Sequence, residues 1–340
     1  MTATTEETVP ATTPSARRLA DRFYPPLGLV AGVGLILRLT YVLAVRDDGV
    51  RGDGEYYHFG GNLLAEGKGF INPVNYILQG VEAPAAIHPP GWTVLLSVPS
   101  LLTFDTFLGH QLFACLVGAA TIVMVGLVGR QVAGDRTGLI AAAIAALYPN
   151  FWLYERELMS ETLVLFLGAL VLLLTFRFRD RPGAVLAALL GAGCGLLALT
   201  RSEQVLLLVV LVPPLILLAP GVPRRRRVAW LALASGTAAV VIAPWAVYNT
   251  ARFEDPVVLS TNLGPTMSVG TCDSTFYGDN LGYFDEECRE GRPAGLMMDS
   301  NDASARDREL QRIALEYLGN NASRVPVVVT AREGRTWGLY

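Results

Sequence analysis

The stretch FLGHQLFACLVGAATIVMVGLV, residues 107–128, contains no Asp, Glu, Lys or Arg over 22 positions. A helix of about 20 apolar residues spans the ~30 Å hydrocarbon core of a bilayer, so this stretch predicts a transmembrane helix. Apolar and polar residues do not alternate in it, as they would in a membrane β-barrel. Similar apolar runs elsewhere bring the predicted spans to seven: Pro25–Val45, Phe107–Val128, Thr137–Trp152, Leu158–Phe176, Ala184–Leu199, Val205–Leu218 and Val228–Val247.

The composition agrees with an all-α polytopic membrane protein. Of 340 residues, 52% are hydrophobic and 17% are charged, whereas soluble domains have about 25% charged residues. The formal net charge of -3 argues against a basic nucleic-acid binder, and the apolar content excludes a disordered chain.

The arginines predict the orientation of the spans. If the N-terminus is cytoplasmic, the segments that carry most of the arginines all lie on the cytoplasmic side, as the positive-inside rule requires. The run Arg224–Arg227 is therefore interpreted as a topology signal, ahead of a nucleic-acid site. The apolar segment Trp92–Phe104 is short, contains Pro99, and would invert this pattern if it crossed. We expect it to lie in the outer interface or to re-enter it.

This topology predicts three parts. Residues 1–23 form a disordered cytoplasmic tail, residues 24–247 form the transmembrane bundle with a large outer loop at 46–106, and residues 248–340 face outward with mixed structure. The end at Tyr340 follows no closing element, and a natural chain that continues into further spans is expected.

The four cysteines divide into two kinds. Cys115 and Cys194 lie within apolar runs and are expected to be packing residues. Cys272 and Cys288 lie in the polar C-terminal segment and could pair in an oxidising compartment.

Ionisable residues gather in the segments that are predicted to face outward. Asp53 lies a few residues beyond the first span in the motif RGDGEYYH, which places a carboxylate where a lipid head group would be. The alternative is a hydrated turn, because Gly-Asp-Gly is ordinary turn chemistry.

The second outer turn carries several acids. Glu161 lies at the mouth of an apolar helix, where a carboxylate costs about 2.5–3.5 kcal/mol to insert and is a functional candidate. Glu157 is four residues earlier and is expected on the same helix face. The alternative is that these acids stabilise a helix N-terminus, which suits Glu155 well and Glu161 poorly.

Two arginines stand where a cation needs a partner. Arg201 lies on the outer side, and a phosphate or a carboxylate such as Glu203 or Glu161 would serve. Arg38 lies inside the first span and is expected to pair with a carboxylate or to extend toward the interface.

Five motifs, in this order and spacing, resemble the GT-C membrane glycosyltransferases. The resemblance is to the bacterial branch related to protein O-mannosyltransferases and aminoarabinose transferases, the family-39-like enzymes. The motifs are GDGEYYHFGGNLLAEGKGF, HPPGW, YP…LMSETLVLFL, LTRSE and APWAVYNTARFEDPVVLSTN.

The resemblance implies a GT-C helical bundle with juxtamembrane helices in the first outer loop and an active site at the outer face. It also implies a polyprenyl-phosphate sugar as donor, with inversion at the anomeric carbon. A lipid phosphate leaves easily, so the reaction needs a base for the acceptor's proton and a cation for the developing charge. The family's acids map to Asp53, as base, and Glu161, which we take as the catalytic pair.

The expected substrate-binding residues are Arg201, which would bind the donor phosphate, and Glu157, Tyr57, His88 and Glu55. His88 begins the His-Pro-Pro motif of the juxtamembrane region. No metal is expected to be required, although Mg or Mn could bind acids at the outer face. One departure is that Gly54 separates Asp53 from Glu55, whereas protein O-mannosyltransferases have adjacent Asp and Glu.

The resulting hypothesis is a hexosyl- or pentosyltransferase in the cell membrane, acting on the extracytoplasmic side. Its partners would be a polyprenyl-phosphate sugar, membrane lipids, and a glycan, lipid or protein acceptor, but no nucleic acid. The alternatives are a catalytically silent protein that binds a lipid or partner, or a transporter whose intramembrane charges line a path.

Overall fold

The computed structural model describes residues 16–45, 52–290 and 302–339, and these fold into helices and loops without a strand. The all-α polytopic class is therefore confirmed. Helix α1 (Ala16–Ala44) begins inside the segment that we predicted to be a tail. Residues 16–23, predicted as part of the disordered tail, are helical, and residues 1–15 lie outside the described residues.

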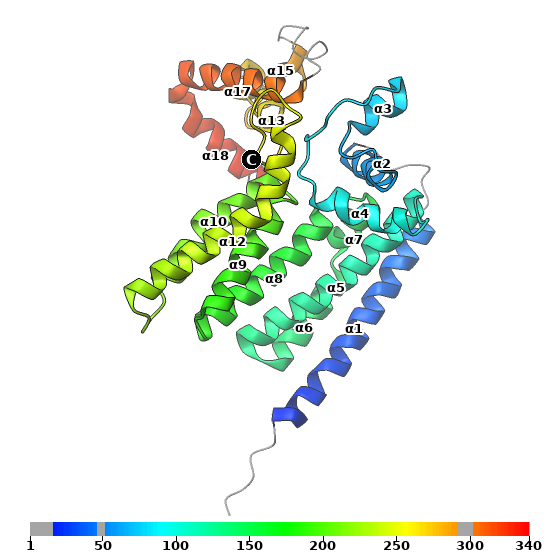
Figure 1. The fold of residues 1–340 in the computed structure, drawn as a ribbon, viewed down its shortest axis with the longest axis vertical. Helices are drawn as coiled ribbons and strands as arrows, with labels where there is room; N and C mark the ends of the chain where they lie inside the picture. Colours follow the sequence, from blue (N-terminus) through cyan, green and yellow to red (C-terminus); the bar gives the residue numbers. More distant parts are fainter. Residues whose placement is uncertain (1–15, 46–51, 291–301, 340) are drawn as a thin grey trace, which may run out of the picture.

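Long helices running in roughly the same direction form the bundle (Figure 1). Within the described residues, four helices are long and apolar enough to cross a membrane, and a bent pair would make a fifth. The four are α1, α5 (Phe107–Ala133), α8 (Glu161–Asp180) and α12 (Arg224–Thr250); the pair is α6 (Asp135–Leu147) with α7 (Pro149–Arg156).

The remaining predicted spans are shorter or broken. The predicted span Thr137–Trp152 is wrong as a single helix, because the chain bends by 50° between α6 and α7. Pro149 disfavours helical geometry at the residue before it. Proline also interrupts the sixth span. The fifth predicted span is the short helix α9 (Ala184–Ala198). The sixth is divided among η1 (Ser202–Leu206), α10 (Leu207–Val210) and α11 (Val212–Leu217).

The first large loop contains three short helices at one end of the bundle. These are α2 (Asp53–Ala65), α3 (Pro73–Gln79) and α4 (Gly91–Leu101). At 11 residues, α4 is about 16 Å long and too short to span a bilayer. It lies across the ends of the long helices (Figure 1). Its length agrees with a segment Trp92–Phe104 that does not cross the bilayer, and its place in the outer interface stays a prediction.

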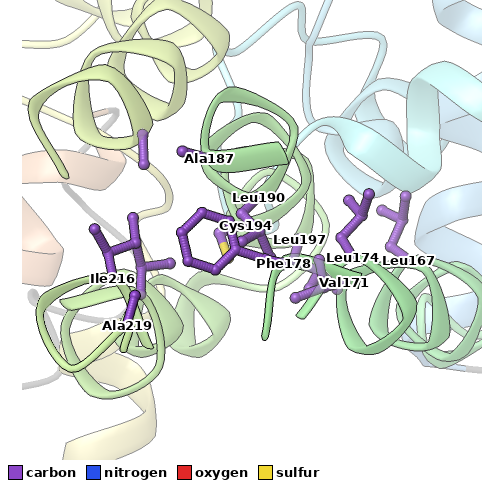
Figure 2. Close-up of a cluster of buried hydrophobic side chains, with 12 residues drawn as sticks. Leu167, Val171, Leu174, Phe178, Ala187, Leu190, Cys194, Leu197, Ile216 and Ala219 are labelled. Atoms are coloured by element: carbon purple, nitrogen blue, oxygen red, sulfur yellow. The ribbon is translucent and has the colours of Figure 1, made fainter. Parts of the chain in front are cut away.

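Two apolar cores hold the bundle together. One joins α1, α5 and α6, and the other joins α8, α9, α11 and α12. In the second, Phe178 of α8 and Cys194 of α9 both belong to the buried cluster between the helices (Figure 2). Because lipid tails are as apolar as these side chains, close packing stabilises such contacts more than the hydrophobic effect does. Cys115 and Cys194 are both buried and unpaired.

A buried ion pair fastens the bend between α6 and α7. Arg38 of α1 is fully buried, and its Nε donates to Glu155 Oε1 at 2.8 Å. Its Nη atoms donate to the carbonyls of Ala145 and Ala146 at 3.1 Å, which end α6 and would otherwise lack helical partners. The interpretation that Glu155 stabilises a helix N-terminus is therefore wrong. Glu155 lies in the last turn of α7 and pairs with Arg38.

The C-terminal segment packs at the same end of the bundle as α2 to α4 (Figure 1). Cys272 and Cys288 form a disulfide within it, with 5.5 Å between their Cα atoms. Asp307 accepts a hydrogen bond from the Gly264 backbone at 2.6 Å, which joins the first and the longest helices of the segment. The helices are α13 (Leu263–Ser268), α14 (Asp273–Phe276), α15 (Glu287–Glu290), α17 (Ala303–Asn320), η2 (Ala322–Arg324) and α18 (Val325–Thr336).

Candidate active site

Asp53 is the first residue of α2 and pairs with His88. The carboxylate Oδ1 lies 3.5 Å from His88 Nε2, and about half of the Asp53 side chain is exposed. The hydrogen bond from His88 lowers the pKa of Asp53; burial opposes this shift, and the charges of His88 and Arg201 add to it. Asp53 is therefore a carboxylate at neutral pH, which is the form that can accept a proton.

Two tyrosines hold the His88 ring in place. The ring centroid lies 5.1 Å from that of Tyr56 and 4.9 Å from that of Tyr57. The loop that carries His88 is also attached to the C-terminal segment, because the Thr261 backbone N–H donates to the Ala86 carbonyl at 2.8 Å. His88 thus has a fixed direction toward Asp53 before any substrate binds.

Tyr57, which we predicted to bind substrate, is only 2% exposed. Burial raises the pKa of Tyr57, and a hydrogen bond with Ser160 opposes the shift. Its contacts with His88 and Ser160 make it a support for the site instead of a surface that a substrate can reach.

Glu161 and Arg201 form an ion pair between the second and third predicted outer turns. Glu161 is the first residue of α8, at the mouth of the helix as predicted, and its Oε1 accepts from Arg201 Nη1. Arg201 Nε also donates to Glu203 at 2.6 Å. Glu161 and Glu203, the two carboxylates predicted as alternative partners of Arg201, therefore both bind it. Its Nη2 has no hydrogen bond to any described residue.

Glu157 lies apart from this ion pair. It follows the last residue of α7, and its ion-pair partner is Arg156. Leu158 then takes a left-handed backbone conformation with φ of 53° before α8 begins at Glu161. The expectation that Glu157 and Glu161 share a helix face is therefore wrong, because α7 ends before Glu157 and a separate helix begins at Glu161. Glu55 is exposed in the first turn of α2.

Two neighbours of the site were not predicted. Ser160, which bonds Tyr57, stands beside Glu161 and has only the common signal of a serine before a helix. Arg252 donates to the Phe70 carbonyl and stacks on Tyr248, 4.4 Å from the ring centroid. The sequence signal for Arg252 is the same as that for Arg201, because each arginine comes shortly after a long apolar run.

No metal centre is evident in this region. Within residues 16–45, 52–290 and 302–339, no three side chains of His, Cys, Asp or Glu gather as metal ligands would. Charged groups in this region include Asp53, Arg201 and the carboxylates that hold Arg201.

This geometry can be compared with known families. Residues 87–248 match the family of dolichyl-phosphate-mannose-protein mannosyltransferases. The match confirms the predicted resemblance to GT-C membrane glycosyltransferases and supports glycosyltransferase activity of that type. It includes His88, Glu161 and Arg201, whereas Asp53 precedes it. A comparison with curated proteins gives no match.

Proposed function

We propose that this protein transfers a sugar from a polyprenyl-phosphate donor to an acceptor hydroxyl at the outer face of the cell membrane, with inversion. The observation that carries the proposal is that one loop joins an acid and a cation from distant segments. His88 of this loop pairs with Asp53, and the Gly91 N–H donates to the Leu199 carbonyl, two residues before Arg201, at 2.7 Å. Asp53 begins α2, Arg201 follows α9, and the charge of Arg201 lowers the pKa of Asp53. The family match supplies the reaction class.

The proposed step is a single displacement. The acceptor oxygen attacks the anomeric carbon and gives its proton to the Asp53 carboxylate. The bond from that carbon to the phosphate oxygen breaks on the opposite face, and its electron pair leaves with the lipid phosphate. Arg201 stabilises the negative charge that develops on this oxygen.

Glu161 and Glu203 orient Arg201 in this proposal. They hold Nη1 and Nε, so that Nη2 can meet the phosphate. Because the guanidinium donates from a rigid plane, fixing two of its nitrogens also fixes the direction of the third. Lysine at position 201 would carry the charge without this geometry.

The test is sugar transfer in membranes that contain the protein, measured with a panel of labelled polyprenyl-phosphate sugars. One donor is expected to give a product whose anomeric configuration, assigned by NMR, is opposite to that of the donor. Arg201→Gln should raise the KM for that donor or lower kcat by about 100-fold. The matched control is Arg136→Gln, which changes an exposed arginine in the first turn of α6. Helix α6 begins at the end of the bundle away from α2 to α4 (Figure 1).

Three results would count against the proposal. They are the absence of transfer from every donor, a retained anomeric configuration, or equal effects of Arg201→Gln and Arg136→Gln. The first would favour a silent binding protein or a transporter, and the second would require a covalent intermediate.

A further inference from the structure

The turn between α7 and α8 holds a residue in an unfavourable conformation. Leu158 has φ of 53° and is fully buried. Its N–H donates to the Glu155 carbonyl, and the Met159 N–H donates to the Tyr154 carbonyl at 2.9 Å. These two bonds are those of a Schellman helix end, in which glycine usually takes the left-handed position. The sequence has leucine there, so the turn needs support from elsewhere.

Trp92 of α4 supplies that support. Its indole Nε1 donates to the Leu158 carbonyl at 2.7 Å across 66 residues of sequence. The Trp92 side chain is fully buried, and it packs with Tyr57, Leu96 and Leu158 in one apolar cluster. A single side chain therefore fixes both the direction of this carbonyl and the position of the leucine.

The start of α4 also holds the turn that carries Arg201. The Gly91 N–H donates to the Leu199 carbonyl at 2.7 Å. A Cβ at Gly91 would lie 2.7 Å from the same oxygen, so only glycine permits this approach. Helix α4 is thus attached to two turns. Trp92 binds the carbonyl of Leu158, three residues before Glu161, and Gly91 binds the carbonyl of Leu199, two residues before Arg201.

We propose that Trp92 is a positioning residue, which holds the strained Leu158 turn so that Glu161 meets Arg201. The proposal rests on the proposed function, because it matters for catalysis only if Arg201 binds the donor. Trp92 itself touches no reacting atom, and its effect passes through the Leu158 carbonyl.

Hydrogen exchange of the turn tests the proposal without an activity assay. In Trp92→Phe, the amides of residues 157–164 should exchange at least about tenfold faster than in the wild type. Trp92→3-benzothienylalanine keeps the two-ring shape and removes only the N–H, so it gives the same test if the phenylalanine variant fails to fold. The matched control is Trp152→Phe, because Trp152 Nε1 donates to the Ala146 carbonyl at 3.0 Å.

The transfer rate then separates positioning from packing. Trp92→Phe should lower kcat about tenfold or more, because small displacements of a catalytic group are costly. Glycine adopts the left-handed conformation freely, so in a Leu158→Gly background the same change should cost roughly threefold or less. A simple packing role for Trp92 predicts equal losses in both backgrounds.

Two outcomes would overturn the proposal. One is unchanged exchange at residues 157–164 in both Trp92 variants, and the other is an equal loss of kcat in the two backgrounds. A wild-type protein that transfers no sugar would refute the proposed function instead, and the exchange data would still decide whether Trp92 holds the turn.

Discussion

Replacing Glu155 by leucine should destabilise the protein strongly. Arg38 and Glu155 are both buried, and the Arg38 side chain is 0% exposed. Glu155→Leu leaves that charge without its carboxylate. Breaking a buried ion pair in this way costs about 3–5 kcal/mol, because the remaining charge is not compensated.

The reverse change and the double change give different expectations. Arg38→Met leaves Glu155 unpaired and also removes the donors to the carbonyls of Ala145 and Ala146. The double variant Arg38→Met/Glu155→Leu has no buried charge. The Ala146 carbonyl keeps its hydrogen bond from Trp152 Nε1, but the Ala145 carbonyl lacks a donor, at about 1–3 kcal/mol for a buried group. It should therefore be less stable than the wild type, yet far more stable than the sum of the single changes predicts.

The assay is equilibrium unfolding in detergent micelles, with SDS as denaturant and tryptophan fluorescence as signal. Glu66→Gln, at an exposed position, serves as a control and should change the free energy of unfolding by less than about 0.5 kcal/mol. The reasoning is refuted if the two single changes add without coupling, or if Glu155→Leu costs no more than the control.

Three further changes test other parts of the structure. Gly91→Ala should cost on the order of 1–3 kcal/mol, because its Cβ would crowd a carbonyl; SDS unfolding at wild-type stability would contradict this. Cys288→Ser removes the disulfide to Cys272 and should destabilise the C-terminal segment by about 3 kcal/mol; limited proteolysis no faster than in the wild type would contradict it. His88 lowers the pKa of Asp53, so the Asp53 charge contributes stability above the ordinary carboxyl pKa and loses it as pH falls through the lowered value. In His88→Gln the acid limb of the transfer rate should therefore move to higher pH, and an unmoved limb would argue against the pairing.

Much of the bundle follows from local sequence. An uncharged run such as 107–128 has only one stable form in lipid, a helix, and α5 covers it. The prediction of one span over 137–152 is wrong because Pro149 disfavours helical geometry at the preceding residue, which is a local effect of the sequence. The pairing of Arg38 with Glu155 depends on how α1, α6 and α7 pack together, and it could not be predicted from the sequence of any one of these helices.

In the candidate site, too, some features could be predicted from the sequence and others depend on the folded structure. The residue types at Asp53, Glu161 and Arg201 mark them as candidates because charge is costly near a membrane. The relation of Glu157 to Glu161 was predicted wrongly because Leu158 has no local signal for a left-handed conformation. Its support comes from Trp92, far away in sequence, and only the folded structure brings the two together.

The most direct test of the proposed function is the transfer rate of Asp53→Asn beside Glu66→Gln, with equal amounts of folded protein. Both variants remove one carboxylate from α2 or its end, but only Asp53 pairs with His88 and lies near Arg201. The account predicts a loss of about 100-fold or more for Asp53→Asn, as expected for a missing general base, and near wild-type transfer for Glu66→Gln. Transfer by Asp53→Asn at the wild-type rate would show that another group accepts the proton.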